Sequence, residues 1–96
     1  MASRPSSAFS QAYTAVAVCA AGTPVPFGVR IVRMEATTDC YVWIGPNVSG
    51  TLNASNGMLL RTPTYGQEFG VYAGDLITVV QAVAAGTLNV SFMAPV

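Results

Sequence analysis

The four acidic residues are the first candidates for acid–base chemistry, because the sequence contains no His and no Lys. They are Glu35, Asp39, Glu68 and Asp75. Glycoside hydrolysis needs two carboxylates that face each other across a cleft, and the spacing of these four singles out no such pair. The serines have no His or Lys to activate them and no Gly-x-Ser-x-Gly motif around them. We therefore predict that the chain is not an enzyme.

The acidic residues are expected to stabilise turns. Asp75 ends the sequence Tyr-Ala-Gly-Asp directly before an expected strand. A carboxylate at such a place accepts hydrogen bonds from backbone N–H groups and fixes the turn, and the same interpretation holds for Asp39. Calcium would need a loop rich in clustered oxygen ligands, and zinc would lack ligands without His. We expect no metal and no cofactor.

The two cysteines, Cys19 and Cys40, are too few for a disulfide scaffold. Each lies within an expected strand, and a disulfide can form only if the two strands are neighbours. There is no Cys-x-x-Cys motif and no residue nearby that would activate a thiolate. We expect two buried free thiols.

The composition argues against a nucleic-acid ligand and favours association with other proteins. The 96 residues have zero formal net charge, with 8% charged and 52% hydrophobic residues, against about 25% charged in an ordinary soluble domain. A chain without a basic excess is poorly suited to a phosphate backbone. No apolar run reaches the length of about 20 residues that spans a bilayer. The run from Ala12 to Ala21 has about the length of the apolar core of a signal peptide, but Tyr13 and Thr14 interrupt it. Because small uncharged domains associate, we expect part of the surface to be an interface between subunits.

Alternation with a period of two predicts β-strands along most of the chain from residue 13 onward. The expected strands are 13–19, 29–34, 40–44, 57–60, 68–72, 76–82 and 87–92. The segment 76–82 is apolar on both faces and is expected to be a central strand. Turn residues separate the strands, notably Asn56-Gly57 and Gly74-Asp75, and residues 48–56 are expected to be a loop.

The expected fold is therefore all-β. No segment has a helical period, and short strands with regular turn signals are typical of a β-sandwich or barrel. Residues 1–12, rich in Ser, Pro and Ala, have no apolar period and are expected to be an extended N-terminal arm. We predict one domain at 13–96, a small antiparallel β-sandwich or jelly-roll-like barrel of about seven or eight strands.

Tyr41 and Trp43 lie on one face of their expected strand, opposite Cys40 and Val42. Sequence alone leaves three roles open for this pair: core packing, a protein interface, or stacking on a sugar ring. Tyr65 and Tyr72 are further candidates for a sugar site. Arg30 and Arg33 are predicted to point to opposite faces of one strand and to pair with carboxylates such as Glu35 or Glu68.

Four stretches resemble small all-β virion proteins of tailed bacteriophages. They are ATTDCYVWIG at 36–45, NGMLL at 56–60, EFGVYAGD at 68–75 and GTLNV at 86–90. The resemblance implies a structural particle component, such as a decoration (cement) protein that stabilises a capsid where capsomers meet. It also implies a homo-oligomer, with a trimer favoured, and it supplies no catalytic residues.

The function expected from these observations is that of a capsid decoration protein, made in the cytoplasm of the bacterial host and located in the virion. Its partners would be further copies of itself and the major capsid protein or another virion protein, with no nucleic acid and no membrane. A head–tail connector, a tail or fibre-base component and a carbohydrate-binding β-sandwich module are the alternatives. The candidate interface residues are Arg4, Phe9, Tyr13, Tyr41, Trp43, Arg61 and Tyr65.

Overall fold

The computed structural model describes residues 3–20, 24–46, 57–61 and 66–95. The expected loop at 48–56 falls outside these residues. The described part contains strands and no helix, as the sequence predicts. The strands are β1 (Ser3–Tyr13), β2 (Val18–Cys19), β3 (Ile31–Ala36), β4 (Cys40–Gly45), β5 (Met58–Leu60), β6 (Gln67–Gly70), β7 (Leu76–Gln81) and β8 (Gly86–Pro95).

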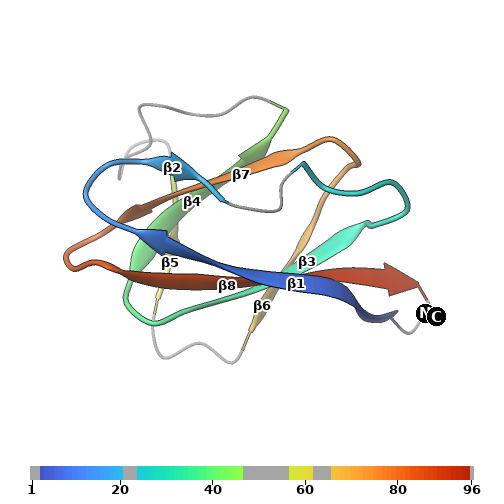
Figure 1. The fold of residues 1–96 in the computed structure, drawn as a ribbon, viewed down its shortest axis with the longest axis horizontal. Coiled ribbons are helices and arrows are strands. Elements are labelled where there is room, and N and C mark those ends of the chain that lie inside the picture. Colours follow the sequence, from blue (N-terminus) through green and yellow to red (C-terminus); the bar gives the residue numbers. More distant parts are fainter. Residues whose placement is uncertain (1–2, 21–23, 47–56, 62–65, 96) are drawn as a thin grey trace.

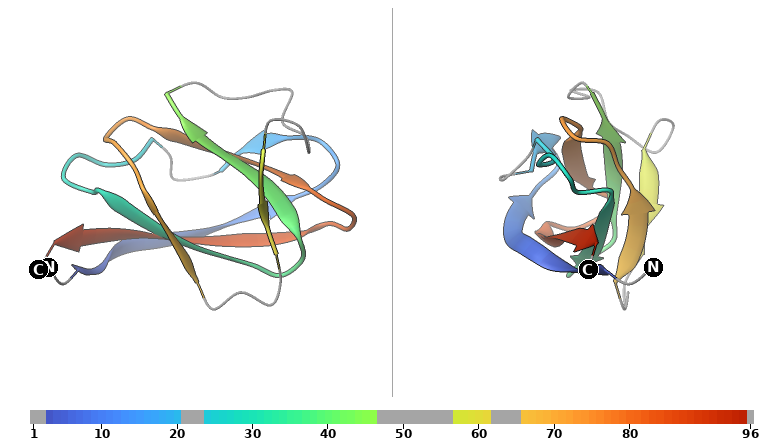
Figure 2. Two further views of the ribbon diagram at one scale, coloured as in Figure 1. Left: turned by 180° about the vertical axis from the view of Figure 1, so that it is seen from behind. Right: turned by 90° about the vertical axis from the view of Figure 1, so that its right-hand side faces the viewer.

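The eight strands form two four-stranded sheets in which every pairing is antiparallel. One sheet has the order β1-β8-β3-β6, and the other has the order β2-β7-β4-β5. In Figure 1, β1 and β8 run side by side along the lower part of the molecule. Seen from behind, β4 crosses in front of them (Figure 2). The arrangement is consistent with a small β-sandwich.

The core lies between the sheets and is built from alternating strand residues of both. On β8, Leu88, Val90 and Phe92 are buried, whereas Asn89 between them is exposed. The opposite sheet contributes inward residues such as Val42. The strand predicted at 87–92 is therefore confirmed. The central position predicted for the strand at 76–82 is confirmed too, because β7 lies between β2 and β4.

The N-terminal segment differs from the expectation of an extended arm, because it is strand β1 and pairs with β8 from Ser3 to Tyr13. The composition of residues 3–13 does not predict a strand. Whether such a segment becomes a strand depends largely on the neighbours that it packs against, and here β8 is that neighbour. Pro5 is compatible with this position, since β1 is an edge strand and its register shifts between Pro5 and Ser7. β8 extends to Pro95, three residues beyond the strand expected at 87–92.

Candidate functional site

The outward face of the sheet β2-β7-β4-β5 bears the aromatic pair that sequence could not place. Cys40 and Val42 are buried in the core, so Tyr41 and Trp43, which alternate with them, point outward. Trp43 keeps 40% of its surface exposed, and Tyr41 is half-buried. The register with the neighbouring strands places other outward residues beside them. We call this surface the apolar face and define it as Cys19, Tyr41, Trp43, Leu59 and Leu76, which keep some solvent exposure, together with Thr78 and Val80, which are buried.

No charged residue occurs in the four strands that form the apolar face. The charged residues that lie within described strands all belong to the other sheet, and they are Arg4, Arg33, Glu35 and Glu68. Arg33 approaches Glu35 to 4.0 Å, which confirms the expected pairing, and Glu68 stands opposite Arg33 on β6. The two sheets thus differ sharply: the strands of one carry charged side chains, including the Arg33–Glu35 ion pair, and the strands of the other carry none.

Among the described residues, the apolar face offers few polar groups that could recognise a sugar. Tyr41 stands opposite Leu59 and Val80, and Trp43 stands opposite Thr78. Thr78 is fully buried, and its Oγ1 has no hydrogen-bond partner among the described residues. Sugar sites combine a stacking ring with several convergent polar groups, and the residues opposite these two aromatics supply none that is exposed. Of the three roles left open by the sequence, this environment favours a protein interface.

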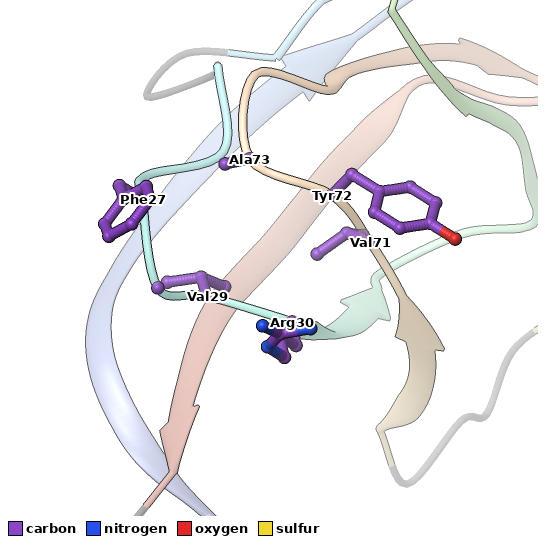
Figure 3. A pocket seen from close by; sticks show the side chains of 7 residues that line it. Phe27, Val29, Arg30, Val71, Tyr72 and Ala73 are labelled. Atoms are coloured by element: carbon purple, nitrogen blue, oxygen red, sulfur yellow. The ribbon is translucent and has the colours of Figure 1, made fainter.

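A second surface feature is a hollow of about 250 Å³ at the loop end of the sandwich. Phe27 and Tyr72 flank it with 97% and 81% of their surfaces exposed, and Arg30 also lines it (Figure 3). Aromatic side chains are enriched at protein interfaces relative to the rest of the surface. Sequence analysis missed Phe27. Its signal was the place of an aromatic residue within a Pro/Gly-rich turn, where no sheet is available to bury it.

The turn beside this hollow is fixed by Asp75, as predicted. Its Oδ2 accepts a hydrogen bond from the Tyr72 amide at 2.9 Å, and its own amide donates to the Tyr72 carbonyl at 3.1 Å. Val25 joins the turn to the β2–β3 connection through backbone bonds to Asp75 and Gly74. Gly74 adopts a φ of 90°, which a glycine accepts without strain. Asp75 therefore has a structural partner in this turn.

A polar hollow of about 240 Å³ lies on the outward face of the other sheet. Its lining residues are Arg33, Glu35, Asn89, Ser91 and Met93. Glu35 is the one carboxylate among them, so this hollow holds no facing pair of the kind that glycoside hydrolysis uses. Within the described part of the chain, no three His, Cys, Asp or Glu residues gather as metal ligands would.

The two cysteines form no disulfide. β2 and β4 lie on opposite sides of β7, so the condition that their strands be neighbours is not met. Cys40 is buried as expected, and burial raises the pKa of its thiol to about 11, which keeps it protonated and unreactive. Cys19 is exposed, which corrects the expectation that both thiols are buried.

Tyr13, one of the candidate interface residues, is buried in the core with 1% of its surface exposed. Its hydroxyl donates to the Thr38 carbonyl at 2.7 Å, lies 2.8 Å from Thr38 Oγ1, and accepts from the Thr38 amide at 3.2 Å. Burial raises the pKa of this hydroxyl. Tyr13 fastens the β3–β4 turn to the end of β1, and it leaves no surface for a partner.

The remaining candidates are spread over the molecule. Phe9 is half-buried on β1, with its ring 5.5 Å from that of Phe92. Arg4 also lies on β1, and Arg61 is exposed directly after β5. Tyr65 falls outside the described residues. The structure therefore brings Tyr41 and Trp43 together, and it does not gather the other candidates around them.

No helix in the described residues has the length and apolar character needed to cross a bilayer. Comparison of the chain with models of protein families, with curated proteins and with solved structures finds no match in any of the three.

Proposed function

We propose that this chain is a non-enzymatic structural component of a bacteriophage particle, a decoration protein that binds the assembled shell and stabilises it. The proposal rests on one observation above all, the uncharged apolar face with Trp43 and Tyr41 at its centre. Depletion of charge together with exposed aromatic residues characterises the buried centre of protein interfaces. A shell offers many equivalent copies of one partner surface, so modest contacts add up.

The strand order supports the same proposal. We infer that the finer class of the fold is a jelly roll, because eight strands in the orders β1-β8-β3-β6 and β2-β7-β4-β5 form its two facing sheets. Jelly rolls are frequent in viral capsid proteins and in lectins. Because a fold by itself does not determine a function, the strand order adds support and the apolar face carries the argument.

The test uses particles of the phage whose genome encodes this chain. Particles made without the chain are mixed with purified protein, and the bound copies are measured after sedimentation. We expect saturable binding that raises the temperature at which the heads release DNA. Trp43→Ala should lower the affinity by at least about 2 kcal/mol, as loss of a central aromatic contact does. Val83→Ala is the matched control, because Val83 is 87% exposed and lies outside the apolar face.

Two outcomes would overturn this proposal. The chain would be no virion component if it were missing from purified wild-type particles. The apolar face would be the wrong attachment surface if Trp43→Ala bound as tightly as Val83→Ala. Labelling of the bound chain in electron micrographs separates a decoration protein on the shell from a head–tail connector or a tail component.

A second candidate function is carbohydrate binding, and the hollow between Phe27 and Tyr72 is the observation that favours it. The Phe27 and Tyr72 rings stand on opposite sides of the hollow and offer faces on which a sugar can stack, and the Arg30 side chain that lines it can donate hydrogen bonds. Titration with a panel of oligosaccharides, followed by NMR of the backbone amides, tests this function. Sugar binding that Tyr72→Ala abolishes and Trp43→Ala preserves would favour this candidate over the shell protein.

A further inference from the structure

Strand β1 is an edge strand of unusual length. The other three sheet edges are short: β2 has two residues, β5 has three and β6 has four. β1 has 11 residues, about twice the usual length of a strand. Short edges protect a sheet from pairing with other chains, as do charges and prolines. Residues 7–13 contain neither a charge nor a proline, so this edge is left open where the others are protected.

The hydrogen bonds of β8 show which backbone groups of β1 point to the open side. The Thr37 amide donates to the Thr87 carbonyl, and the Thr87 amide donates to Thr37 Oγ1, so the backbone of Thr87 points away from β1. Ala12 stands opposite Thr87. Ala12 and Thr87 are therefore a pair without mutual hydrogen bonds, and the amide and carbonyl of Ala12 point away from β8, towards the open edge. Hydrogen-bonded and non-hydrogen-bonded pairs alternate in an antiparallel ladder. The same holds for Ser10 and Ala8.

The side chains along this edge suit an approaching strand. Ala8, Ser10 and Ala12, on the outward face of the sheet, are small and uncharged. Phe9, on the inward face, is only half-buried, since no further strand of its sheet covers it. The Ala12 carbonyl accepts a bond from its neighbour, the Gln11 side-chain amide, at 2.8 Å. A backbone N–H from another strand can take the place of that exposed amide.

We propose that two copies of this chain associate through β1, antiparallel and about a two-fold axis at Ser10. In this register Ser10 meets Ser10, and Ala8 of one copy meets Ala12 of the other. The backbone amides and carbonyls of Ala8, Ser10 and Ala12 that point towards the open edge then all form hydrogen bonds with the other copy. Side chains on the inward face of one sheet stay opposite side chains on the inward face of the other. The two sheets β1-β8-β3-β6 become one continuous sheet across the axis.

A second copy is the occupant that this edge fits best, because the segment is complementary to itself. Antiparallel pairing of residues 8–12 with the same residues places no charge opposite a like charge, and it opposes only small side chains on the outward face. The contact joins two chains through one edge of the sheet. It is therefore compatible with the trimer that the resemblance implies, provided that the trimer forms through another surface. The inference concerns association in solution and stands whether or not the chain belongs to a phage particle.

Introducing a charge at the two-fold axis tests the proposal. Sedimentation equilibrium of the wild type from about 1 µM to about 1 mM should show a monomer–dimer equilibrium. Ser10→Lys places two like charges opposite each other and should weaken the dimer at least about tenfold, as should Ser10→Glu. An equimolar mixture of the two should restore it. Gln67→Lys, which adds the same charge to the exposed β6 edge, should leave the dimer unchanged.

A second variant probes the edge without touching Ser10, which also binds Asn89 at 2.6 Å. Ala8→Pro removes an amide that points outward, so the pairing of β1 with β8 is kept and the dimer is weakened. Circular dichroism and the thermal midpoint show whether each variant is folded. The proposal fails if the wild type stays monomeric over the whole range. It fails equally if folded Ser10→Lys and Ala8→Pro dimerise like the wild type, or if the mixture restores nothing.

Discussion

Replacing Tyr13 by Phe should destabilise the fold by about 1–3 kcal/mol, the cost of leaving buried hydrogen-bonding groups without partners. The change removes one oxygen atom and keeps the ring, so packing in the core is preserved. Three contacts with Thr38 are lost, at 2.7, 2.8 and 3.2 Å. Thr38 itself is half-buried, and its Oγ1 keeps a bond to the Ala84 carbonyl at 3.0 Å. Water can therefore compensate for part of the loss, which sets the lower end of this range.

Urea unfolding, followed by the fluorescence of Trp43, measures this change in the free energy of unfolding. For a domain of this size, 1 kcal/mol corresponds to a shift of about 4–8 °C in the thermal midpoint, so a scan of the circular dichroism signal is sensitive enough. Tyr72→Phe is the control, because Tyr72 is 81% exposed and should change stability by less than about 0.5 kcal/mol. If Tyr13→Phe were as stable as this control, the reasoning that Tyr13 fastens the β3–β4 turn would be refuted.

Three further predictions concern stability. Gly86→Ala should cost about 1–3 kcal/mol in urea unfolding, because its Cβ would lie 2.7 Å from the Tyr13 hydroxyl; Gly70→Ala, with open space around it, should be neutral within about 0.5 kcal/mol. Stability should fall as the pH rises from 9.0 to about 11, since burial raises the pKa of Cys40 over that interval and only the unfolded chain releases its proton freely; the loss reaches about 3 kcal/mol, and a Cys40→Ala variant should show a flatter profile. Thr78→Val should raise the free energy of unfolding by about 1 kcal/mol, because it removes a buried hydroxyl that has no hydrogen-bond partner among the described residues, and a lower urea midpoint would contradict this.

The proposed β1 contact and the proposed function concern different surfaces. The two-fold contact lies at one edge of the sheet β1-β8-β3-β6, whereas the apolar face belongs to the other sheet. Both surfaces can therefore be occupied at once. A dimer formed through β1 would present two apolar faces, and paired attachment of this kind raises the overall affinity for a shell without any new contact.

The strands that sequence predicted well are those whose signal is local. β8 alternates between apolar and polar residues, β4 and β7 are short apolar runs, and turn residues bound all three, so their existence follows from short stretches of chain. The role of Asp75 in its turn is predictable for the same reason, because its carboxylate accepts a hydrogen bond from a backbone amide only three residues away. The all-β class and the uncharged composition also follow from the sequence alone.

The features that sequence could not decide depend on what lies opposite a segment. Residues 3–13 have no alternation, and they form a strand because β8 pairs with them. Alternation shows that Tyr41 and Trp43 share a face, but only the position of the second sheet decides that this face is outside. In the same way, β7 separates the two cysteines, and Tyr13 reaches a turn 25 residues away. A period of two defines two faces of a strand, and only tertiary packing decides which of them is buried.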